Sequence, residues 1–599
     1  MNAPKPAQPV PSPALSSASS SARTGQRWPA IWGPRLWALL ALALVLTLYR
    51  VWVVHHSGIS LFFDEAQYWD WSRHLQWGYY SKPPMIAGLI KVGSALFGDG
   101  VIGIKLLPML LYPATAVAMV GLARALWPTS SGVRTGVVAG ALFLTLPVVG
   151  TMGLFASTDA PLLLCWTLAA WALWRAQVTN RMQHWVLLGV ACGLGIMSKY
   201  TMVAFALTAL WVLWAVHGPK RGLLRVGPWV SVLITLLIVG PNLLWNAQNG
   251  FPTLQHTAEL TTQSGRDGGP MSSLAFLAGQ ALMLGPLAVI GALWLWWRGR
   301  RAEPTPAAPR SQWASSTQMA PPSQWAATTT FSTNSQPPGS AAGAGASGKP
   351  VARTSAYYLA SVSSYRFLWA LSLPLIAIAT VQAFSGGANL NWAAPAVVGL
   401  SLLIASRVSP PLIPLAARRP QGWLVSMLLS NLALTSAALH VRDVLPEPTA
   451  SRLDALVRMR GWQESFKDIE PVLLEPVVTG LPVLADSRVL ITQALYNWRA
   501  HKIRAFYWNP AALKNNHYLL QHSLPNKIGP DVLLITANPK PDDITQRFAI
   551  VRHMKSTQVK VAENRYVVMH AFFLRGFLGY DQQTYMEQSG SPVTSMETP

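Results

Sequence analysis

Three carboxylates stand close together in the segment LFFDEAQYWDWSRHLQWGYYSKPP, which runs from Leu61 to Pro84: Asp64, Glu65 and Asp70. Carboxylates can remove a proton from a hydroxyl group or hold a hard divalent cation. The segment follows an apolar stretch long enough to cross a bilayer. The acids are therefore expected just outside a membrane, where acidic side chains commonly belong to a functional site.

The acidic residues before His440 are few and unevenly placed. On the topology derived below, all but the last lie on or near the outer face. Acids contribute little to topology, so orientation alone does not explain this bias, whereas a shared outer-face site does. The eight are Asp64, Glu65, Asp70, Asp99, Asp159, Glu259, Asp267 and Glu303.

Asp159 stands in FASTDAPLLL, at the entry to a predicted span. A carboxylate there could simply cap the helix and favour the positive end of its dipole. Asp64 and Glu65 could likewise cap a short loop helix, DEAQYWDWSRHL. The Asp64–Glu65 pair and Asp159 are both predicted at the outer membrane surface. This common position favours one catalytic site.

Two lysines are the matching candidates for binding an anion. Lys82 stands in YYSKPP, where prolines fix the backbone direction. Lys199 stands in GIMSKYT, at a predicted outer turn. In the simpler interpretation, each lysine extends its side chain toward the lipid headgroups and has no other role. The functional alternative is an electrostatic clamp on a phosphate group, with Arg73 and His74 as less specific helpers.

The aromatic residues of the first outer segment suit a helix lying in the membrane interface. Their rings could also stack against sugars or guide a lipid tail. The turn SGGANLNWAAP contains Asn391 and could hydrogen-bond hydroxyl groups, or it could be only a glycine-rich turn. We take Tyr79, Tyr80, His74 and Asn391 as candidate substrate-binding residues.

The composition identifies a membrane protein with several spans. The 599 residues are 51% hydrophobic and 12% charged, about half the charged fraction of ordinary soluble domains. The apolar stretches mostly lack the polar face of soluble helices. The net charge of +23 often indicates nucleic-acid binding, but here the arginines stand in short loops between apolar stretches. Cys165 and Cys192 both lie within apolar stretches, which argues against a disulfide scaffold.

The loop charges predict the topology. Loops predicted to be cytoplasmic carry several arginines, whereas the short outer segments 153–160 and 385–391 carry no lysine or arginine. This pattern places the first acidic segment and the C-terminal 160 residues outside. The eleven predicted spans are 35–54, 101–123, 136–152, 161–177, 184–199, 201–216, 228–246, 273–297, 367–384, 391–406 and 421–439.

The chain divides by composition into six parts. The expected fold is a polytopic α-helical membrane protein with about eleven transmembrane helices and a small C-terminal periplasmic α/β domain. In the latter, LPVLADSRVLITQALYNWRAH predicts a strand and a helix, and DVLLITANP and NRYVVMHAFFL predict further strands. The parts are a disordered cytoplasmic N-terminus (1–34), a catalytic membrane module (35–300) with an outer loop (55–100), a low-complexity cytoplasmic linker (301–366), further spans (367–440), the α/β domain (441–580) and a flexible tail (581–599).

Several of these motifs together resemble a known family. They are FDEAQYWDWSRHLQWGYYSKPPMIAGLI, STDAPLLL, LGIMSKYT, GPNLLWNAQNG and NLNWAAPA, in this order over roughly residues 35–440. They resemble the bacterial branch of the GT-C glycosyltransferases, related to protein O-mannosyltransferases and to the aminoarabinose–lipid A transferase. The Asp-Glu pair followed by Lys-Pro-Pro is the most specific part.

The resemblance implies an inverting transferase at the periplasmic face of the bacterial inner membrane. The donor would be a polyprenyl-phosphate sugar, and the acceptor a lipid, glycan or protein. By position, Asp64 matches the catalytic acid of the first loop, Glu65 its motif partner and Asp159 the second-loop acid. Lys82 matches a lysine near the phosphate in the aminoarabinose branch. Many other members of the family have histidine at this position.

The residues suit this chemistry. Inverting transfer needs a base near the attacking hydroxyl, which we assign to Asp64. The departing phosphate needs positive charge from Lys82, Lys199 or Arg73, or from a divalent cation held by Asp64, Glu65 and Asp159. No other cofactor is expected.

Three other functions fit parts of the sequence. A lipid or ion transporter or flippase would place ionisable groups through the middle of the bilayer, and no acid lies at mid-span. A membrane scaffold would leave the clustered acids unexplained. A hydrolase of polyprenyl-linked sugars would use water in place of the acceptor.

Overall fold

The structure, a computed structural model, describes residues 33–128, 130–256, 268–291, 293, 363–409 and 418–581. The predictions for the N-terminal segment, the low-complexity linker and the tail lie largely outside these residues. So do the predicted positions of Glu259, Asp267 and Glu303.

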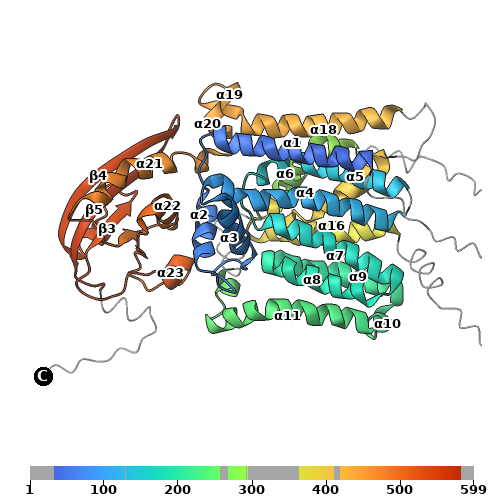
Figure 1. The fold of residues 1–599 in the computed structure, drawn as a ribbon, viewed down its shortest axis with the longest axis horizontal. Coiled ribbons are helices and arrows are strands. Elements are labelled where there is room, and N and C mark those ends of the chain that lie inside the picture. Colours follow the sequence, from blue (N-terminus) through green and yellow to red (C-terminus); the bar gives the residue numbers. More distant parts are fainter. Residues whose placement is uncertain are drawn as a thin grey trace, which may run out of the picture.

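Helices cover the eleven predicted spans wherever the structure describes them, and most lie side by side in one bundle (Figure 1). Six helical stretches in the described part are long and apolar enough to cross a membrane, so the count of eleven spans stays a prediction. The helices are α1 (Pro34–His56), α4 (Val101–Leu126), α5 (Ser130–Thr145), α6 (Pro147–Met152), α7 (Asp159–Thr179), α8 (Met182–Ser198), η1 (Tyr200–Ala204), α9 (Phe205–His217), α10 (Pro219–Leu223), α11 (Val226–Gln248), α13 (Pro270–Leu284), α16 (Ser364–Gly386), η3 (Leu390–Ala393), α17 (Ala396–Val408) and α18 (Arg418–Leu439).

The bundle is apolar both inside and outside. Its interior is packed with aliphatic and aromatic residues such as Leu142, Phe143 and Trp166. Its outer surface also exposes large apolar side chains, among them Leu44 and Leu237, which are 59% and 67% exposed. A soluble bundle would present a polar surface there, so this distribution fits lipid as the surrounding solvent.

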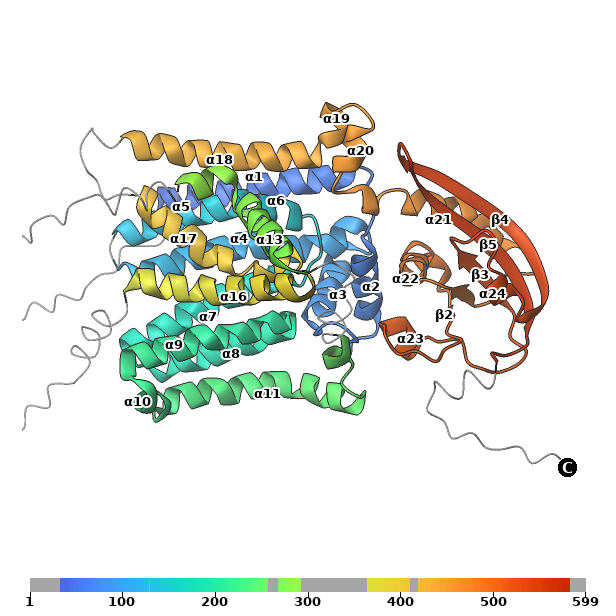
Figure 2. The same cartoon turned by 180° about the vertical axis from the view of Figure 1, so that it is seen from behind.

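The two ends of the bundle differ. The short helix α10, which carries Lys220 and Arg221, lies at the end farther from the C-terminal domain (Figure 1). At the other end, α2 (Phe63–Arg73) and α3 (Met85–Phe97) lie between the long helices and the C-terminal domain (Figures 1 and 2). The first acidic segment and the C-terminal domain therefore lie at the same end, as the charge pattern predicts.

The C-terminal domain is built on one mixed sheet with strand order β2-β1-β3-β5-β4. Strands β2, β1 and β3 are parallel, whereas β5 pairs antiparallel with both β3 and β4. The strands are β1 (Val483–Ala485), β2 (Ala505–Tyr507), β3 (Val532–Thr536), β4 (Phe548–Ala562) and β5 (Arg565–Phe577). The helices are α19 (Val441–Val444), α20 (Thr449–Leu453), η5 (Val457–Met459), α21 (Trp462–Ile469), η6 (Glu470–Leu474), α22 (Arg488–Asn497), η7 (Arg499–His501), α23 (His517–Gln521) and α24 (Asp542–Thr545).

The predicted strands β1, β3 and β5 and the helix α22 are confirmed. Sequence analysis missed β2 and β4. Strand β2 has only three residues, and most side chains of the edge strand β4 are at least partly exposed. Neither strand shows the run of buried aliphatic residues that identifies a central strand.

Candidate active site

A cavity of about 770 Å³ opens where the membrane bundle meets the C-terminal domain. The first outer segment, the loop before α7, the turn at η3 and the region around η5 all contribute to its lining. Six residues that the sequence analysis selected are in this lining. They are Asp64, Glu65, Lys82, Asp159, Lys199 and Asn391.

Asp159 connects three separate segments within this cavity. Its Oδ1 atom accepts a hydrogen bond from Lys199 Nζ at 2.7 Å. Its Oδ2 atom accepts from Asn391 Nδ2 and from Ser157 Oγ, both at 2.9 Å. Asp159 is also the first residue of α7 and is buried. Thr158 is the N-cap residue of α7 and no side-chain capping hydrogen bond forms there, so Asp159 does not cap the helix, although its position in the first turn suits the helix dipole.

Glu65 has a different environment, in a buried ion pair at the wall of the cavity. Lys105 Nζ lies 2.7 Å from Glu65 Oε1 and 2.6 Å from Oε2, and it also donates to the carbonyl oxygen of Leu154. The backbone N–H groups of Phe62 and Ala156 donate to the same carboxylate. Both Glu65 oxygens are thus occupied, and the contacts attach α2 to α4 and to the loop before α7.

Asp64 pairs with a cation from the C-terminal domain. Arg488 donates to Asp64 Oδ1 and, at 2.7 Å, to Gln67 Oε1. Its guanidinium also lies over the ring of Phe63, 5.1 Å from the centroid. Asp64 retains 36% of its side-chain exposure, and within the described residues no hydrogen bond reaches its second oxygen. One Asp64 oxygen therefore remains open to a ligand.

Lys82 is the cation in this group with an unsatisfied charge. Within the described part of the chain its ammonium forms no ion pair, unlike that of Lys199. Burial lowers the pKa of Lys82, and the neighbouring ammonium of Lys199 lowers it further. The carboxylates of Asp64 and Asp159 raise the pKa of Lys82 but do not offset these effects, and a bound anion would add further opposite charge.

A second, smaller cavity of about 400 Å³ adjoins the first. The two share Lys82, Lys199 and Trp392 in their linings. The remainder of the second cavity is largely apolar, with Ala204, Leu375, Ile378 and Ala379 from the helices around it. The two lysines therefore stand between a cavity of mixed polarity, which the acids line, and a more apolar one.

Four predicted site residues do not line either cavity. Arg73 forms an ion pair with Asp99 at 3.2 Å and lies beside the ring of Trp69. His74 lines separate cavities with Arg73 and Asp70. The donor-binding role of Arg73 and the substrate-binding role of His74 stay predictions that this placement does not favour, because neither side chain lines the two cavities that hold the lysines.

The tyrosines have structural surroundings as well. The Tyr79 ring stacks on Trp71 with 4.2 Å between centroids, and its hydroxyl donates to the carbonyl oxygen of Trp71. Tyr80 is buried beside His256. Tyr79 and Tyr80 are buried and do not line the large cavity, so their substrate-binding role stays a prediction that this placement does not favour.

The structure adds residues that sequence analysis missed. Lys105 is a lone cation within an apolar span, and such a residue needs a buried partner, so its position was an available signal. Arg488, Arg458 and Arg565 carried no such signal, because basic residues are frequent in the C-terminal domain. Arg458 and Arg565 line the large cavity, and both side chains are exposed.

The predicted carboxylate site for a divalent cation stays a prediction that the pairing does not favour. Asp64, Glu65 and Asp159 each face a different cation: Arg488, Lys105 and Lys199. Three carboxylates that are individually neutralised offer little negative charge to a metal ion. Among the described residues, the ligand-type side chains close enough to share an ion are another group, considered below.

Part of the chain around this cavity is similar to a known protein family. Residues 81–245 match the family described as dolichyl-phosphate-mannose-protein mannosyltransferase. The match includes Lys82, Asp159 and Lys199, whereas Asp64 and Glu65 precede it.

Two curated relatives are transferases. The chain is 25% identical over 503 residues to the lipid A galacturonosyltransferase RgtD of Rhizobium johnstonii, covering 83% of this chain and 90% of that protein. It is 27% identical over 224 residues to an undecaprenyl phosphate-alpha-4-amino-4-deoxy-L-arabinose arabinosyl transferase of Pseudomonas fluorescens. The second match covers 35% of this chain and 40% of that protein.

Two solved structures share the fold. ArnT from Cupriavidus metallidurans in the apo state aligns with a TM-score of 0.53 and 14% identity, over 90% of this chain and 97% of that one. The same protein bound to undecaprenyl phosphate aligns with a TM-score of 0.54 and 16% identity, over 90% and 98%.

Proposed function

We propose that this chain, a GT-C glycosyltransferase of the superfamily that includes protein O-mannosyltransferases and aminoarabinose–lipid A transferases, moves a sugar from a polyprenyl-phosphate donor to a lipid acceptor. The reaction takes place at the periplasmic face of the bacterial inner membrane. A lipid acceptor is proposed because the relative RgtD is named for lipid A. A glycan or protein acceptor is the alternative that the assay below distinguishes.

The observation that carries this proposal is the position of the two lysines between the cavities. A polyprenyl-phosphate sugar has three parts with different solvation: an apolar tail, an anionic phosphate and a polar sugar. The apolar cavity would take the first part of the tail, and Lys82 and Lys199 would bind the phosphate. The large cavity, which is lined by the acids and Asn391, would take the sugar. The order of tail, phosphate and sugar in the donor thus matches the order of the apolar cavity, the two lysines and the large cavity in the protein.

Lys82 is the main phosphate ligand in this arrangement. Of the two lysines, Lys82 has no ion-pair partner among the described residues, whereas Lys199 already donates to Asp159. As the bond between sugar and phosphate breaks, negative charge grows on the phosphate oxygens. A positioned ammonium stabilises that charge most where water is excluded.

Asp64 is the proposed general base. Inverting transfer is a single displacement in which the acceptor hydroxyl attacks the anomeric carbon and loses its proton to a nearby base. The open oxygen of Asp64 faces the large cavity, while Arg488 holds the other. Asp159 would position Lys199 and Asn391, and Asn391 would hydrogen-bond the sugar.

Glu65 is better suited to positioning than to catalysis. Its two oxygens are occupied by Lys105 and by backbone donors, so a proton transfer would require breaking a buried ion pair. It instead fixes the first turn of α2, and with it the direction of Asp64.

The acceptor would enter from the side of the C-terminal domain. Arg458 and Arg565 line the large cavity on that side and have exposed side chains. An acceptor lipid with phosphate groups would find two guanidinium groups there, and arginine binds phosphates in a bidentate manner.

The experiment is a donor-consumption assay with purified protein in lipid bilayers. A panel of undecaprenyl-phosphate sugars is supplied with lipid A, with a protein extract or with no acceptor. Asp64→Asn is compared with Asp99→Asn, a matched acid of the same outer segment that pairs with Arg73 away from the cavity. The proposal expects lipid-dependent consumption that Asp64→Asn abolishes and Asp99→Asn retains.

Other outcomes change the proposal in defined ways. Consumption without any acceptor would indicate a hydrolase. Consumption that depends on the protein extract alone would replace the lipid acceptor by a protein. Equal activity of Asp64→Asn and wild type would refute the assignment of the base.

A further inference from the structure

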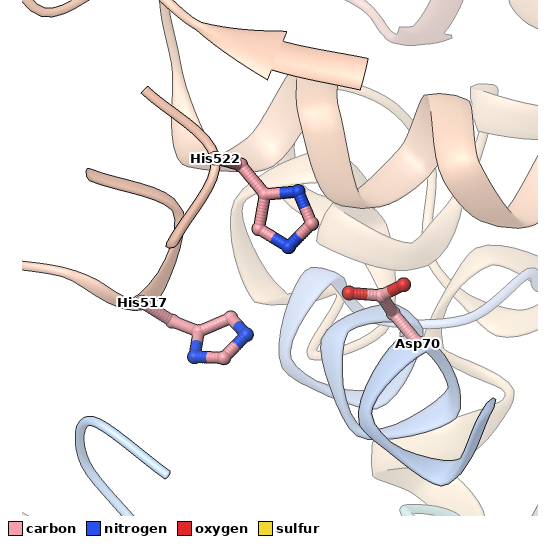
Figure 3. A group of neighbouring side chains, drawn as sticks. All are labelled: Asp70, His517 and His522. Atoms are coloured by element: carbon pink, nitrogen blue, oxygen red, sulfur yellow. The ribbon is translucent and has the colours of Figure 1, made fainter. Parts of the chain in front are cut away.

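Two histidines and one aspartate from different parts of the chain meet beside α2, apart from the large cavity. Asp70 lies near the end of α2, His517 begins α23 and His522 directly follows it. One potential ligand atom from each side chain lies within 4.8 Å of the other two. Figure 3 shows both imidazole rings turned toward the Asp70 carboxylate.

The hydrogen bonds of this group are incomplete. Asp70 Oδ2 accepts from the Tyr518 hydroxyl at 3.0 Å, but within the described residues neither imidazole forms a hydrogen bond. His517 is only 3% exposed, and its Nδ1 atom is buried without a partner there. Buried polar atoms almost always have a partner, which may be water or an ion. An incomplete set of two imidazoles and a carboxylate therefore points to a ligand.

We propose that Asp70, His517 and His522 bind a zinc ion that joins α2 to the C-terminal domain. The site does not depend on the proposed transferase function. It is also distinct from a carboxylate site at Asp64, Glu65 and Asp159.

The donor set suits zinc. Two neutral imidazoles and one carboxylate, with water in a fourth position, form a common zinc environment. Ligand atoms about 2.1 Å from a tetrahedral zinc lie about 3.4 Å apart, so binding would draw the three side chains slightly closer. The neighbouring cavity of about 390 Å³ also contains His74, Gln76 and Gln521, and it has room for the water.

The surroundings of the ligands support the same assignment. The hydroxyl of Tyr518 holds one oxygen of Asp70, and outer contacts of this kind fix the direction of metal ligands. The ring of His517 packs edge-on against Trp71, with 5.2 Å between centroids. The two histidines are five residues apart in NNHYLLQHS, within the range of spacings seen for paired histidine ligands of zinc.

The consequence would be mechanical. Asp64 lies at the start of α2 and Asp70 near its end, and Arg488 of the C-terminal domain already contacts Asp64. A zinc ion at Asp70 would strengthen the connection near the other end of α2, where Tyr518 already donates to Asp70. The end of α2 that carries Asp64 would then be held at a constant distance from the domain.

The test measures zinc in the full-length protein. Purified protein is stripped with a chelator, equilibrated with zinc alone, desalted and analysed for metal by mass spectrometry. Wild type should retain about one zinc per chain, as expected of a single site. His522→Ala and Asp70→Asn should bind at least about tenfold more weakly, since even outer-contact mutations have effects of that size.

The matched control is His501→Ala, which removes a half-buried histidine of the same domain that pairs with Glu470. It should retain zinc like wild type, and size-exclusion elution should show that every compared variant is folded. Cobalt added to wild type should also produce visible absorption typical of nitrogen and oxygen ligands. The proposal is overturned if wild type retains no zinc and gives no cobalt spectrum, or if Asp70→Asn and His522→Ala retain as much zinc as His501→Ala.

Discussion

Asp64 and Glu65 are neighbours in the chain but lie in opposite environments. Glu65 is 1% exposed and its two oxygens are held by Lys105 and backbone N–H groups. Asp64 keeps 36% of its side-chain exposure and contacts Arg488 through one oxygen. Glu65 is therefore held in a buried ion pair at the wall of the cavity, whereas Asp64 keeps one oxygen open to it.

The difference shows how a short motif can combine stability and chemistry. Successive residues of a helix point about 100° apart, so the first turn of α2 can direct one carboxylate inward and the next outward. The buried ion pair then fixes the backbone that carries the reactive carboxylate. Each prediction below tests one side of this division.

The largest expected effect is that of replacing Asp64 on the rate of transfer. Asp64→Asn should lower the rate of transfer by about 10²–10⁴-fold, because the loss of a general base has effects of that size. Its unfolding temperature should remain close to that of wild type, since the pair with Arg488 is half exposed. Single-turnover kinetics and thermal unfolding would measure the two quantities. A rate within threefold of wild type would contradict the division.

Disruption of the buried pair between Glu65 and Lys105 should lower the free energy of unfolding. Lys105→Met leaves Glu65 buried without its cation, and breaking one partner of a buried pair costs about 3–5 kcal/mol of unfolding free energy. The double variant Glu65→Gln and Lys105→Met should recover most of this loss, because no unpaired charge remains. Denaturant unfolding of all three proteins measures the coupling. Equal losses in the single and double variants would show that the charge pair is not the cause.

Lys82 should affect donor binding. Lys82→Ala removes a charged hydrogen bond to phosphate, which contributes about 1.5–3 kcal/mol, or roughly 10–150-fold in donor affinity. Lys82→Arg should restore part of this loss. Binding of undecaprenyl phosphate measured by calorimetry would check both. The prediction fails if Lys82→Ala binds as tightly as wild type.

The pH dependence of the same binding follows from the lowered pKa of Lys82. Only the ammonium form attracts phosphate. As pH rises through the lowered pKa of the free protein, binding must take up a proton, so donor affinity should fall at a lower pH than an ordinary lysine would give. Lys82→Arg should remove this decline. A wild-type affinity that stays constant up to pH 10 would contradict it.

The smallest effect is expected for Arg488. Arg488→Gln breaks a half-exposed pair with Asp64, and such pairs contribute about 0–1 kcal/mol. The unfolding free energy should therefore change little, and the change should shrink further at high salt. Denaturant unfolding at low and high salt would measure it. A loss as large as that of Lys105→Met would place Asp64 with Glu65 among the structural acids.

The sequence alone determined the class of protein and the type of its site. Apolar stretches of span length and arginine-rich loops follow from the cost of exposing backbone and charge to lipid, so they can be recognised without a structure. The same holds for Asp159, Lys82, Lys199 and Asn391. Ionisable groups beside apolar spans are few, and these four residues line one cavity.

Only the tertiary structure decided which side of α2 each residue faces. The residues Arg73, His74, Tyr79 and Tyr80 belong to the same segment as Asp64, yet they point away from the cavity. The partners Lys105 and Arg488 are about 40 and 420 positions away from Glu65 and Asp64. Pairing over such separations depends on how helices and domains pack, which local sequence patterns do not encode.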